Sequence, residues 1–200
     1  MNSSCIICIL DVSKKPQSVS TIISILRGIN VSGKNKIPMV ELKAMYEDLK
    51  FKNVITYIQS GNVMFSVNES DSKVLSQKIE QGILKKFGFN VPVITRTIDE
   101  IQSTIKKNPF LKDKGIELDK LHVTFLEDSP AADNLKKVME YNYEPDKFTI
   151  VGKEVYLHCP NGYGNTKLTN TFFENKLKVR ATTRNWRTTN ELLRIALEIK

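Results

Sequence analysis

The chain has 200 residues, of which 40% are apolar and 26% are charged, and its net charge is +8 at pH 7. This is the balance of an ordinary folded protein, and the length allows one sizeable core or two small ones. The apolar run CIICIL at 5–10 is far shorter than the roughly 20 residues of a membrane span, and no basic residue precedes it as in a secretory signal. We therefore expect a cytoplasmic protein without a membrane segment.

The first half of the chain shows the order strand, helix, strand, strand, helix, strand. The expected segments are a strand at 20–29, a helix at 38–51, a hairpin at 54–67, a helix at 70–89 and a strand at 91–97. Pro38 suits the first position of a helix, Gly61 suits the turn of a hairpin, and Gly88 suits the end of a helix.

The second half repeats this order after a helical connector. The expected segments are the connector at 97–110, a strand at 120–128, a helix at 129–142, a hairpin at 146–159, a helix at 166–179, a strand at 180–185 and a final helix at 187–200. Pro130 and Gly152 take the places of Pro38 and Gly61, and the stretch TTRN echoes the earlier ITRT. These offsets all lie near about ninety residues, which indicates a tandem duplication.

This order matches the split βαβ plan twice. We predict an α+β protein built as a tandem pair of ferredoxin-like βαββαβ units, with antiparallel sheets and an added C-terminal helix. The expected division is an N-terminal extension at 1–20, a first unit at 21–98, a helical connector at 99–120, and a second unit with the C-terminal helix at 121–200.

A glycine-rich stretch, GINVSGKNKIP at 28–38, is the first candidate site. It is one residue short of the phosphate-binding pattern G-x-x-x-x-G-K-[ST], because Asn35 has no hydroxyl for a magnesium ion, and the next helix starts about four residues too late. We therefore expect no nucleotide hydrolysis. Gly28 and Gly33 allow an open backbone, and Arg27 and Lys34 supply charge, so the loop can hold an anion. The alternative is a tight turn with solvated lysines.

The second candidate site lies between CPNGYGNTKLTN and RATTRNW, where basic residues greatly outnumber the single Glu174. We expect a helix that starts beside Lys167, and the last strand to deliver Arg184 and Trp186. Arginine beside an aromatic ring is typical of sites that hold a phosphate while stacking a base. The alternative is that Trp186 anchors the final helix to the core. The repeat also predicts that Arg96 and Arg184 occupy equivalent corners.

The cysteines and histidines give weaker signals. Cys5 and Cys8 form a C-x-x-C pair without a second pair, so a buried apolar segment is favoured over a metal or redox site. His122 and His158 are expected on neighbouring central strands, where a paired-histidine site and half-buried structural histidines are both open. We predict no metal and no cofactor.

Several long motifs together resemble an uncharacterised bacterial family called domain of unknown function sixteen-ninety-seven. These motifs are LRGINVSGKNKIPMVEL, TYIQSGNVMF, KNPF, HVTFLED and LHCPNGYGNTKLTNTFFENKLKVRATTRNW. The resemblance runs from about Thr21 to the C-terminus, so residues 1–20 look like an extension. It implies a compact α/β protein of repeated ferredoxin-like character, and it implies no activity.

Three functions remain open from the sequence. The preferred one is non-catalytic binding of an anionic ligand, either nucleic acid or a nucleotide-like metabolite, since the basic balance favours an anionic partner. An enzyme acting on a small phosphorylated or carboxylated substrate and a structural protein with incidental basic charge are the alternatives. The expected ligand-binding residues are Arg27, Gly28, Gly33, Lys34, Asn35, Lys167, Arg184 and Trp186.

Overall fold

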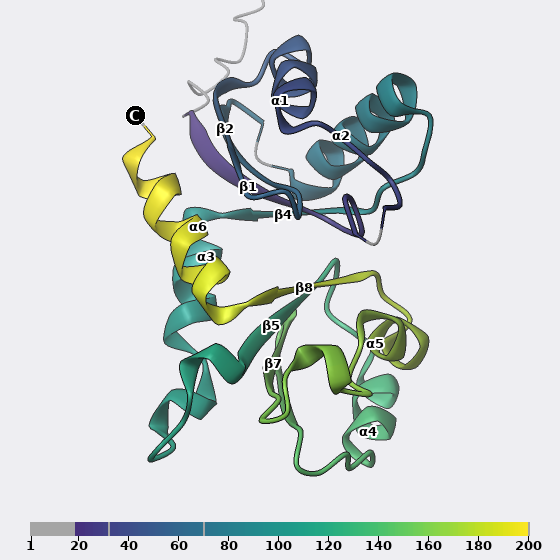
Figure 1. Ribbon diagram of the computed structural model, residues 1–200, viewed down its shortest axis with the longest axis vertical. Helices are drawn as coiled ribbons and strands as arrows, with labels where there is room; N and C mark the ends of the chain where they lie inside the picture. Colours follow the sequence, from purple (N-terminus) through teal and green to yellow (C-terminus); the bar gives the residue numbers. More distant parts are fainter. Residues whose placement is uncertain (1–18, 32, 70, 200) are drawn as a thin grey trace, which may run out of the picture.

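Two antiparallel four-stranded sheets and six α-helices make up the part of the chain that the computed structural model describes, residues 19–31, 33–69 and 71–199 (Figure 1). The expected α+β class is therefore confirmed. The extension with Cys5 and Cys8 lies almost wholly outside the described residues. No helix in the described ranges is long and apolar enough to cross a membrane.

The first sheet and its helices form what we call the first unit. Its elements are β1 (Ser20–Leu26), α1 (Met39–Asp48), β2 (Lys52–Tyr57), β3 (Asn62–Val67), α2 (Ser72–Phe87) and β4 (Val93–Thr97). Asp71 caps α2 by accepting from the backbone N–H of Lys73 at 2.8 Å, and Gly88 ends the helix in the left-handed conformation. The predicted strand and helix order is found.

The second unit comprises the second sheet with α4 and α5, and it is preceded by α3 and followed by α6. The elements are α3 (Ile98–Lys106), the 3₁₀ turns η1 (Pro109–Lys112) and η2 (Leu118–Lys120), β5 (Leu121–Leu126), α4 (Ala132–Met139), β6 (Lys147–Val151), β7 (Glu154–His158), the 3₁₀ turn η3 (Tyr163–Asn165), α5 (Asn170–Leu177), β8 (Ala181–Asn185) and α6 (Trp186–Glu198). The order of elements predicted for the second half is also found.

Both sheets have the same strand order. It is β2-β3-β1-β4 in the first unit and β6-β7-β5-β8 in the second, with every neighbouring pair antiparallel. Each sheet therefore has two central strands, β1 with β3 and β5 with β7. The first strand of each unit lies beside the last strand of the same unit.

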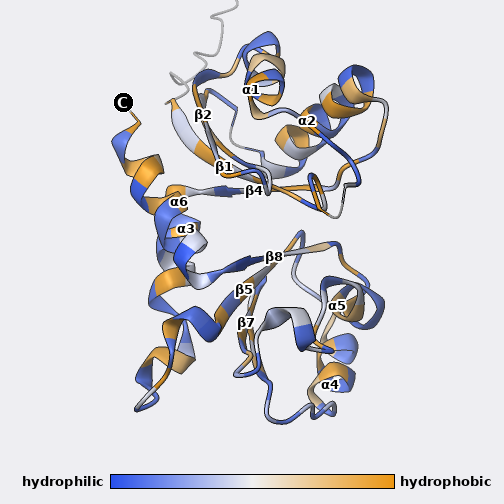
Figure 2. Cartoon of the chain, viewed as in Figure 1, coloured by the Kyte–Doolittle hydropathy of each residue, from blue (hydrophilic) through white to orange (hydrophobic). Residues whose placement is uncertain are grey.

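Three apolar cores result from this layering. Helices α1 and α2 cover one face of the first sheet, and α4 and α5 cover one face of the second (Figure 1). The other two sheet faces enclose a shared core together with α3 and α6, to which both sheets contribute, for example Ile23 and Val123. Figure 2 shows hydrophobic and hydrophilic stretches alternating along α6, as expected for a helix with one buried side. The open faces of both sheets are therefore used in packing.

Two sequence-based expectations are wrong in detail. Helix α5 begins at Asn170 and not beside Lys167, because Thr169 is the residue whose hydroxyl accepts from the backbone N–H of Phe172. The two histidines lie on opposite faces of their sheet, since the register pairs His122 with Leu157 and places His158 one residue further along. A paired-histidine site is therefore excluded.

Candidate anion-binding site

Among the described residues of the loop at 28–38, four have left-handed backbone. The φ angles are 69° at Gly28, 55° at Asn30, 76° at Gly33 and 47° at Asn35. Glycine and asparagine are the residues that adopt this conformation most readily, so the sequence suits the loop it forms. The two glycines have open space around the position of a Cβ, so their requirement is conformational and not steric.

Asn30 fixes the shape of this loop. Its side-chain amide donates to the carbonyl of Ile37 at 2.9 Å and to that of Gln59 at 3.0 Å, while its Oδ1 accepts from the N–H of Ile37 at 2.8 Å. Ile29 and Ile37 are buried beneath the loop. The loop is thus anchored to the core and to the β2–β3 turn. Sequence reasoning missed Asn30, although an asparagine between two glycines is a signal for left-handed backbone.

A hollow of about 420 Å³ opens beside the loop, at the N-terminal end of α1. It is lined by Asn30, Gly33, Lys36, Ile37, Pro38, Met39 and Gln59. No side chain caps α1, because Pro38 stands at the capping position, and the first helical N–H groups point toward this end. Lys34 and Lys36 are exposed, and neither forms an ion pair with another described residue. The arrangement favours an anion.

The length of this loop distinguishes the two units. Residues 27–38, twelve in all, join β1 to α1, whereas residues 127–131, five in all, make the equivalent connection from β5 to α4. The shorter connection shows that the topology itself needs fewer residues. The additional residues of the first unit form the glycine-rich loop.

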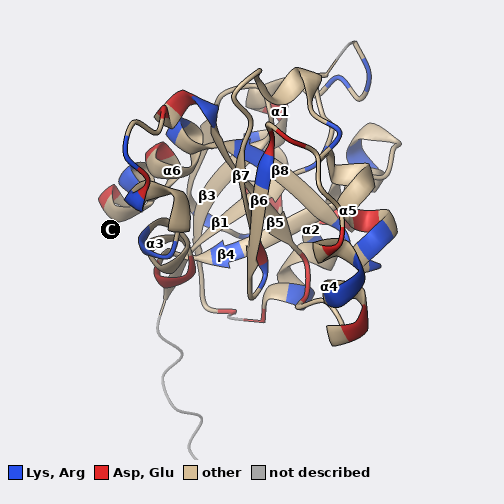
Figure 3. Cartoon of the chain, turned by 90° about the horizontal axis from the view of Figure 1, so that it is seen from below, with Lys and Arg blue, Asp and Glu red and all other residues tan. Residues whose placement is uncertain are grey.

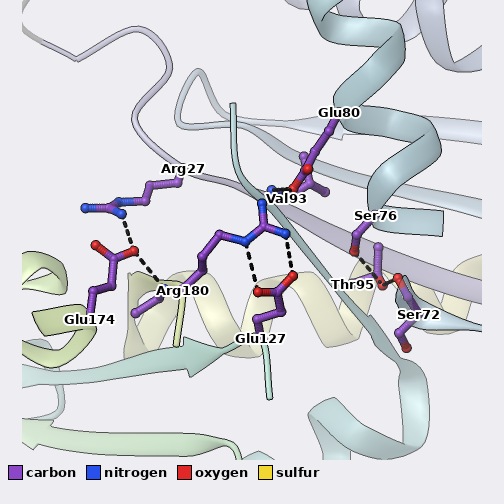
Figure 4. Close-up of polar contacts among 10 residues, drawn as sticks. Arg27, Ser72, Ser76, Glu80, Val93, Thr95, Glu127, Glu174 and Arg180 are labelled. Carbon is purple, nitrogen blue, oxygen red and sulfur yellow. Dashed lines mark hydrogen bonds and ion pairs between the residues drawn. The ribbon is translucent and has the colours of Figure 1, made fainter. Parts of the chain in front are cut away.

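Arg27, at the base of the loop, is bonded to the second unit. Its guanidinium forms an ion pair with Glu174 of α5, and the same carboxylate accepts from the N–H of Ala181 at 3.0 Å (Figure 4). Arg27 also acts on Tyr163, whose pKa is raised by burial, while a hydrogen bond to Thr183 and the charge of Arg27 oppose that rise. Arg27 therefore has a partner already, and its charge is only partly available to a ligand.

A second inter-unit cluster lies beside this pair. Arg180 donates from Nε to Glu127 at 2.9 Å and from Nη1 to Glu80 at 2.7 Å, and Glu80 also accepts from the N–H of Val93 at 2.9 Å (Figure 4). Glu80 on α2 and Glu174 on α5 thus make equivalent contacts. Each carboxylate accepts from the backbone N–H of the first residue in the last strand of its own unit, and each pairs with an arginine of the other unit.

The expectation that Arg184 presents its charge to a ligand is not met, because its side chain is buried. Only 8% of the residue is exposed, and its guanidinium donates to Oδ1 of Asn62 at 2.6 Å and to the carbonyls of Leu26 and Ser60 at 2.8 Å each. Burial lowers the pKa of Arg184 to about 10, with the charge relation to Tyr163 opposing the shift, so the side chain stays charged at neutral pH. Arg184 stabilises the start of the loop through its hydrogen bond to the carbonyl of Leu26, the residue before Arg27.

Arg96 of the first unit makes equivalent contacts to the second unit. It donates to the carbonyl of Leu126 at 2.5 Å and to Glu154 at 3.3 Å, as Arg184 does to the carbonyl of Leu26 and to Asn62. Leu126 and Leu26 end β5 and β1. The expectation that Arg96 and Arg184 occupy equivalent corners is confirmed, but both corners are internal.

Trp186 and Lys167 are not part of the loop site. Trp186 is 6% exposed and begins α6 in the shared core, so the interpretation of an anchor for the final helix fits its position. Lys167 is exposed, and its ammonium lies 5.7 Å from the ring centre of Tyr143. The loop itself thus brings together Gly28, Gly33, Lys34 and Asn35, with Arg27 and Arg184 at its base.

Other reactive residues show structural surroundings. Cys159 is unpaired and buried, and burial raises the pKa of its thiol to about 11. His122 stacks on Tyr163 with ring centres 4.9 Å apart. Within the described ranges, no group of three or more His, Cys, Asp or Glu side chains is placed to hold a metal ion.

A family model and a solved structure are similar to this chain. The family model described as "Protein of unknown function (DUF1697)" matches residues 19–156. The solved structure of conserved bacterial protein SP0830 from Streptococcus pneumoniae is similar in fold, with a TM-score of 0.72 at 19% sequence identity over 90% of this chain and 99% of that one. No curated protein matches significantly.

Proposed function

The chain belongs to the family described as "Protein of unknown function (DUF1697)", which assigns no chemistry, and on that premise we propose from its own residues that it binds a phosphate-bearing, nucleotide-like ligand without catalysis. The proposed site is the hollow beside the loop at 28–38, with Lys34 and Lys36 as the charged contacts. The backbone N–H groups at the start of α1 supply further donors.

The observation that carries this proposal is an anchored loop with two lysines that form no ion pair with another described residue. Asn30 bonds to Ile37 near the other end of the loop and to Gln59 in the β2–β3 turn, so these parts of the loop are held in place before a ligand binds. Lys36 lines the hollow of about 420 Å³, and Lys34 follows Gly33, which also lines it. Both lysines are exposed and have no ion-pair partner among the described residues. A solvated turn would need neither the anchoring nor the additional length.

The proposed architecture is a tandem pair of ferredoxin-like units. The strand order of each sheet, with the first strand between the third and the last, is the order of that plan. The reciprocal contacts of Arg96 and Arg184 support a duplication, because each arginine reaches the end of the first strand in the other unit.

Packing of the sheets favours a small ligand at this site over nucleic acid. RNA-recognition modules of this kind of plan bind RNA on the open sheet face. Here both open faces lie in the shared core, where Met64 and Phe125 are fully buried. A hollow at the edge of one unit suits a single phosphate-bearing molecule better than a strand.

Isothermal titration calorimetry with inorganic phosphate and with a mononucleotide tests the proposal. We expect Lys36→Ala to weaken mononucleotide binding about threefold to tenfold, since it removes one charge-assisted contact worth about 1 kcal/mol. Lys43→Ala, which removes an exposed lysine of α1 outside the hollow, is the matched control and should have no effect. Glu41→Gln should strengthen binding slightly, because it removes an acid from the first turn of α1. No heat with either probe, from a folded protein, contradicts the proposal.

The variant Asn35→Thr tests whether the loop can support nucleotide hydrolysis. Asn35→Thr completes the written phosphate-binding pattern, yet Asn35 has left-handed backbone and its side chain donates to the carbonyl of Gly28 at 3.2 Å. We expect no magnesium-dependent ATPase activity in this variant. Hydrolysis above background in a purified sample would overturn that expectation.

A further inference from the structure

The outer side of the second unit carries a hollow of about 490 Å³ between α4 and α5. It is lined by Asn134, Lys137, Glu140, Tyr141, Asn175, Lys176 and Lys178. Three lysines against one acid give this small area a net positive charge, and Figure 3 shows basic segments on both helices. Lys137 and Lys178 form no ion pair with any described residue. Asn134 holds the two helices together by donating to the carbonyl of Leu177 at 3.3 Å.

Aromatic rings lie directly beside these lysines. The rings of Tyr141 and Tyr143 are nearly parallel, with an angle of 19° between their planes, and both stand edge-on to Phe172 at 82° and 83°. Phe172 therefore packs against both tyrosine rings. Tyr141 is 36% exposed, so part of its ring faces solvent.

Lysine ammonium groups occupy positions over these rings. The Nζ atom of Lys176 lies 4.4 Å from the ring centre of Tyr141 and donates to its hydroxyl, and Lys167 lies over Tyr143. A cation over an exposed ring is held weakly, and lysine side chains are flexible. A planar group that stacks on Tyr141 can displace the ammonium, which is then free to contact a phosphate next to that group.

A second hollow continues on the other side of Tyr141. It measures about 400 Å³, and its lining includes the rings of Tyr141, Tyr143 and Phe148 together with the charged residues Glu144, Asp146 and Lys147. The positive charge of the surface therefore lies on the side of α4 and α5. The two hollows share Tyr141, so they adjoin at this ring. Parallel aromatic planes beside unpaired lysines are the combination that binds successive bases and phosphates of a single strand.

We propose that this lysine–tyrosine surface, formed by Lys137, Tyr141, Tyr143, Phe172, Lys176 and Lys178, binds single-stranded nucleic acid. One base stacks on Tyr141, and the adjacent phosphates pair with the lysines of α4 and α5. The surface lies on the second unit and does not include the loop at 28–38, so it is independent of the function proposed for that loop.

Fluorescence anisotropy with a labelled single strand of about ten nucleotides tests this proposal at about 50 and 200 mM salt. We expect Tyr141→Ala to weaken binding about tenfold, within the range for the loss of one stacked base, and Tyr141→Phe to bind within about twofold of the parent. Lys137→Ala should weaken binding and reduce the salt slope by about one phosphate contact.

One control variant tests whether any exposed lysine would give the same effect. Lys43→Ala removes an exposed lysine of α1 outside both sites, and it should not change the affinity for the strand. Thermal melting of each variant identifies any loss of fold. Absence of binding by the folded parent protein overturns the proposal. So does equal binding by Tyr141→Ala with an unchanged salt slope, or competition by a mononucleotide that is as effective per nucleotide as the strand.

Discussion

At the scale of single residues, the two buried arginines account for much of how the units are joined. Arg184 reaches three backbone carbonyls around the end of β1 and the β2–β3 turn, and Arg96 reaches the end of β5. A buried guanidinium is tolerated only where its donors are satisfied. These side chains therefore fix the position of one unit against the other, and with it the base of the glycine-rich loop.

Removal of either arginine should destabilise the protein strongly. We expect Arg184→Ala and Arg96→Ala each to lower the free energy of unfolding by about 3–5 kcal/mol, because each removes a donor from buried carbonyls, and Arg96→Ala also from the partly buried carboxylate of Glu154. Arg194→Ala is the control, since Arg194 is exposed and bonds only to residues of its own helix, and its effect should stay within about 0.5 kcal/mol. Urea titration measures all three, and equal effects would contradict the structural role.

His122 should make stability depend on pH. Burial lowers the pKa of His122 below its ordinary value, and the Lys120 carbonyl and the charge of Asp119 oppose that shift. As the pH falls below about 6.5, the unfolded chain takes up a proton that the folded protein resists, so the free energy of unfolding decreases. We expect the melting temperature to fall between about pH 7.5 and pH 5.

The variant His122→Asn should lose part of this pH dependence, whatever its effect on stability at a single pH. His158→Asn controls for the removal of an imidazole as such. If His122→Asn showed the same change in melting temperature between the two pH values as the parent protein, another group would be responsible for the effect.

At the scale of elements, the two hairpin turns provide a matched pair. Gly61 and Gly152 both have left-handed backbone, with φ of 79° and 63°. A Cβ at Gly61 would lie 2.8 Å from side-chain atoms of both Leu26 and Ile29, whereas at Gly152 the nearest atom, on Glu154, is 4.0 Å away. Gly61 therefore carries a steric requirement in addition to the conformational one.

Alanine substitution should separate these two requirements. We expect Gly152→Ala to cost about 1 kcal/mol of unfolding free energy for the left-handed backbone alone, and Gly61→Ala to cost about 1–3 kcal/mol more because of overpacking. Denaturant melts of the two variants measure the difference. A cost at Gly61 no greater than that at Gly152 would mean that Leu26 and Ile29 move aside freely.

Elements with strong local signals could be predicted from the sequence, and those set by tertiary contacts could not. The hairpins and α2 follow from β-rich runs about glycine turns and from a helix with caps at both ends. The start of α5 depends on which of several Thr and Asn residues becomes the cap, and the cap proved to be Thr169. The faces of His122 and His158 depend on register, which no local pattern determines.

The candidate site likewise has features that the sequence predicts and features that depend on tertiary contacts. Left-handed backbone at Gly28 and Gly33 was predictable from residue type. The burial of Arg184 and Trp186 was not, because a basic cluster beside an aromatic residue in the sequence is equally compatible with a ligand site and with an interface inside the protein. Tyr141 and Tyr143 become notable only when α4 and α5 pack side by side.

At the scale of the whole molecule, the shared core makes the two units dependent on each other. Ile23 and Met64 from the first sheet lie in the same cluster as Val123 and Phe125 from the second, and Leu192 of α6 completes it. Helix α6 follows the second unit in the chain yet also contacts β1 and β3 of the first. Each unit alone would expose one apolar sheet face, and its interface arginine would lose the acceptors that it finds in the other unit.

We therefore expect the full chain to unfold in a single cooperative transition, with equal calorimetric and van't Hoff enthalpies, although it contains two separate four-stranded sheets. A fragment of residues 19–97 should not form a stable folded monomer, because about half of its sheet surface packs against the rest of the chain in the intact protein. Differential scanning calorimetry of the full chain and circular dichroism of the fragment measure these two properties. Two separate transitions, together with a folded fragment, would show that the units are independent domains and that the arginine contacts between them contribute little.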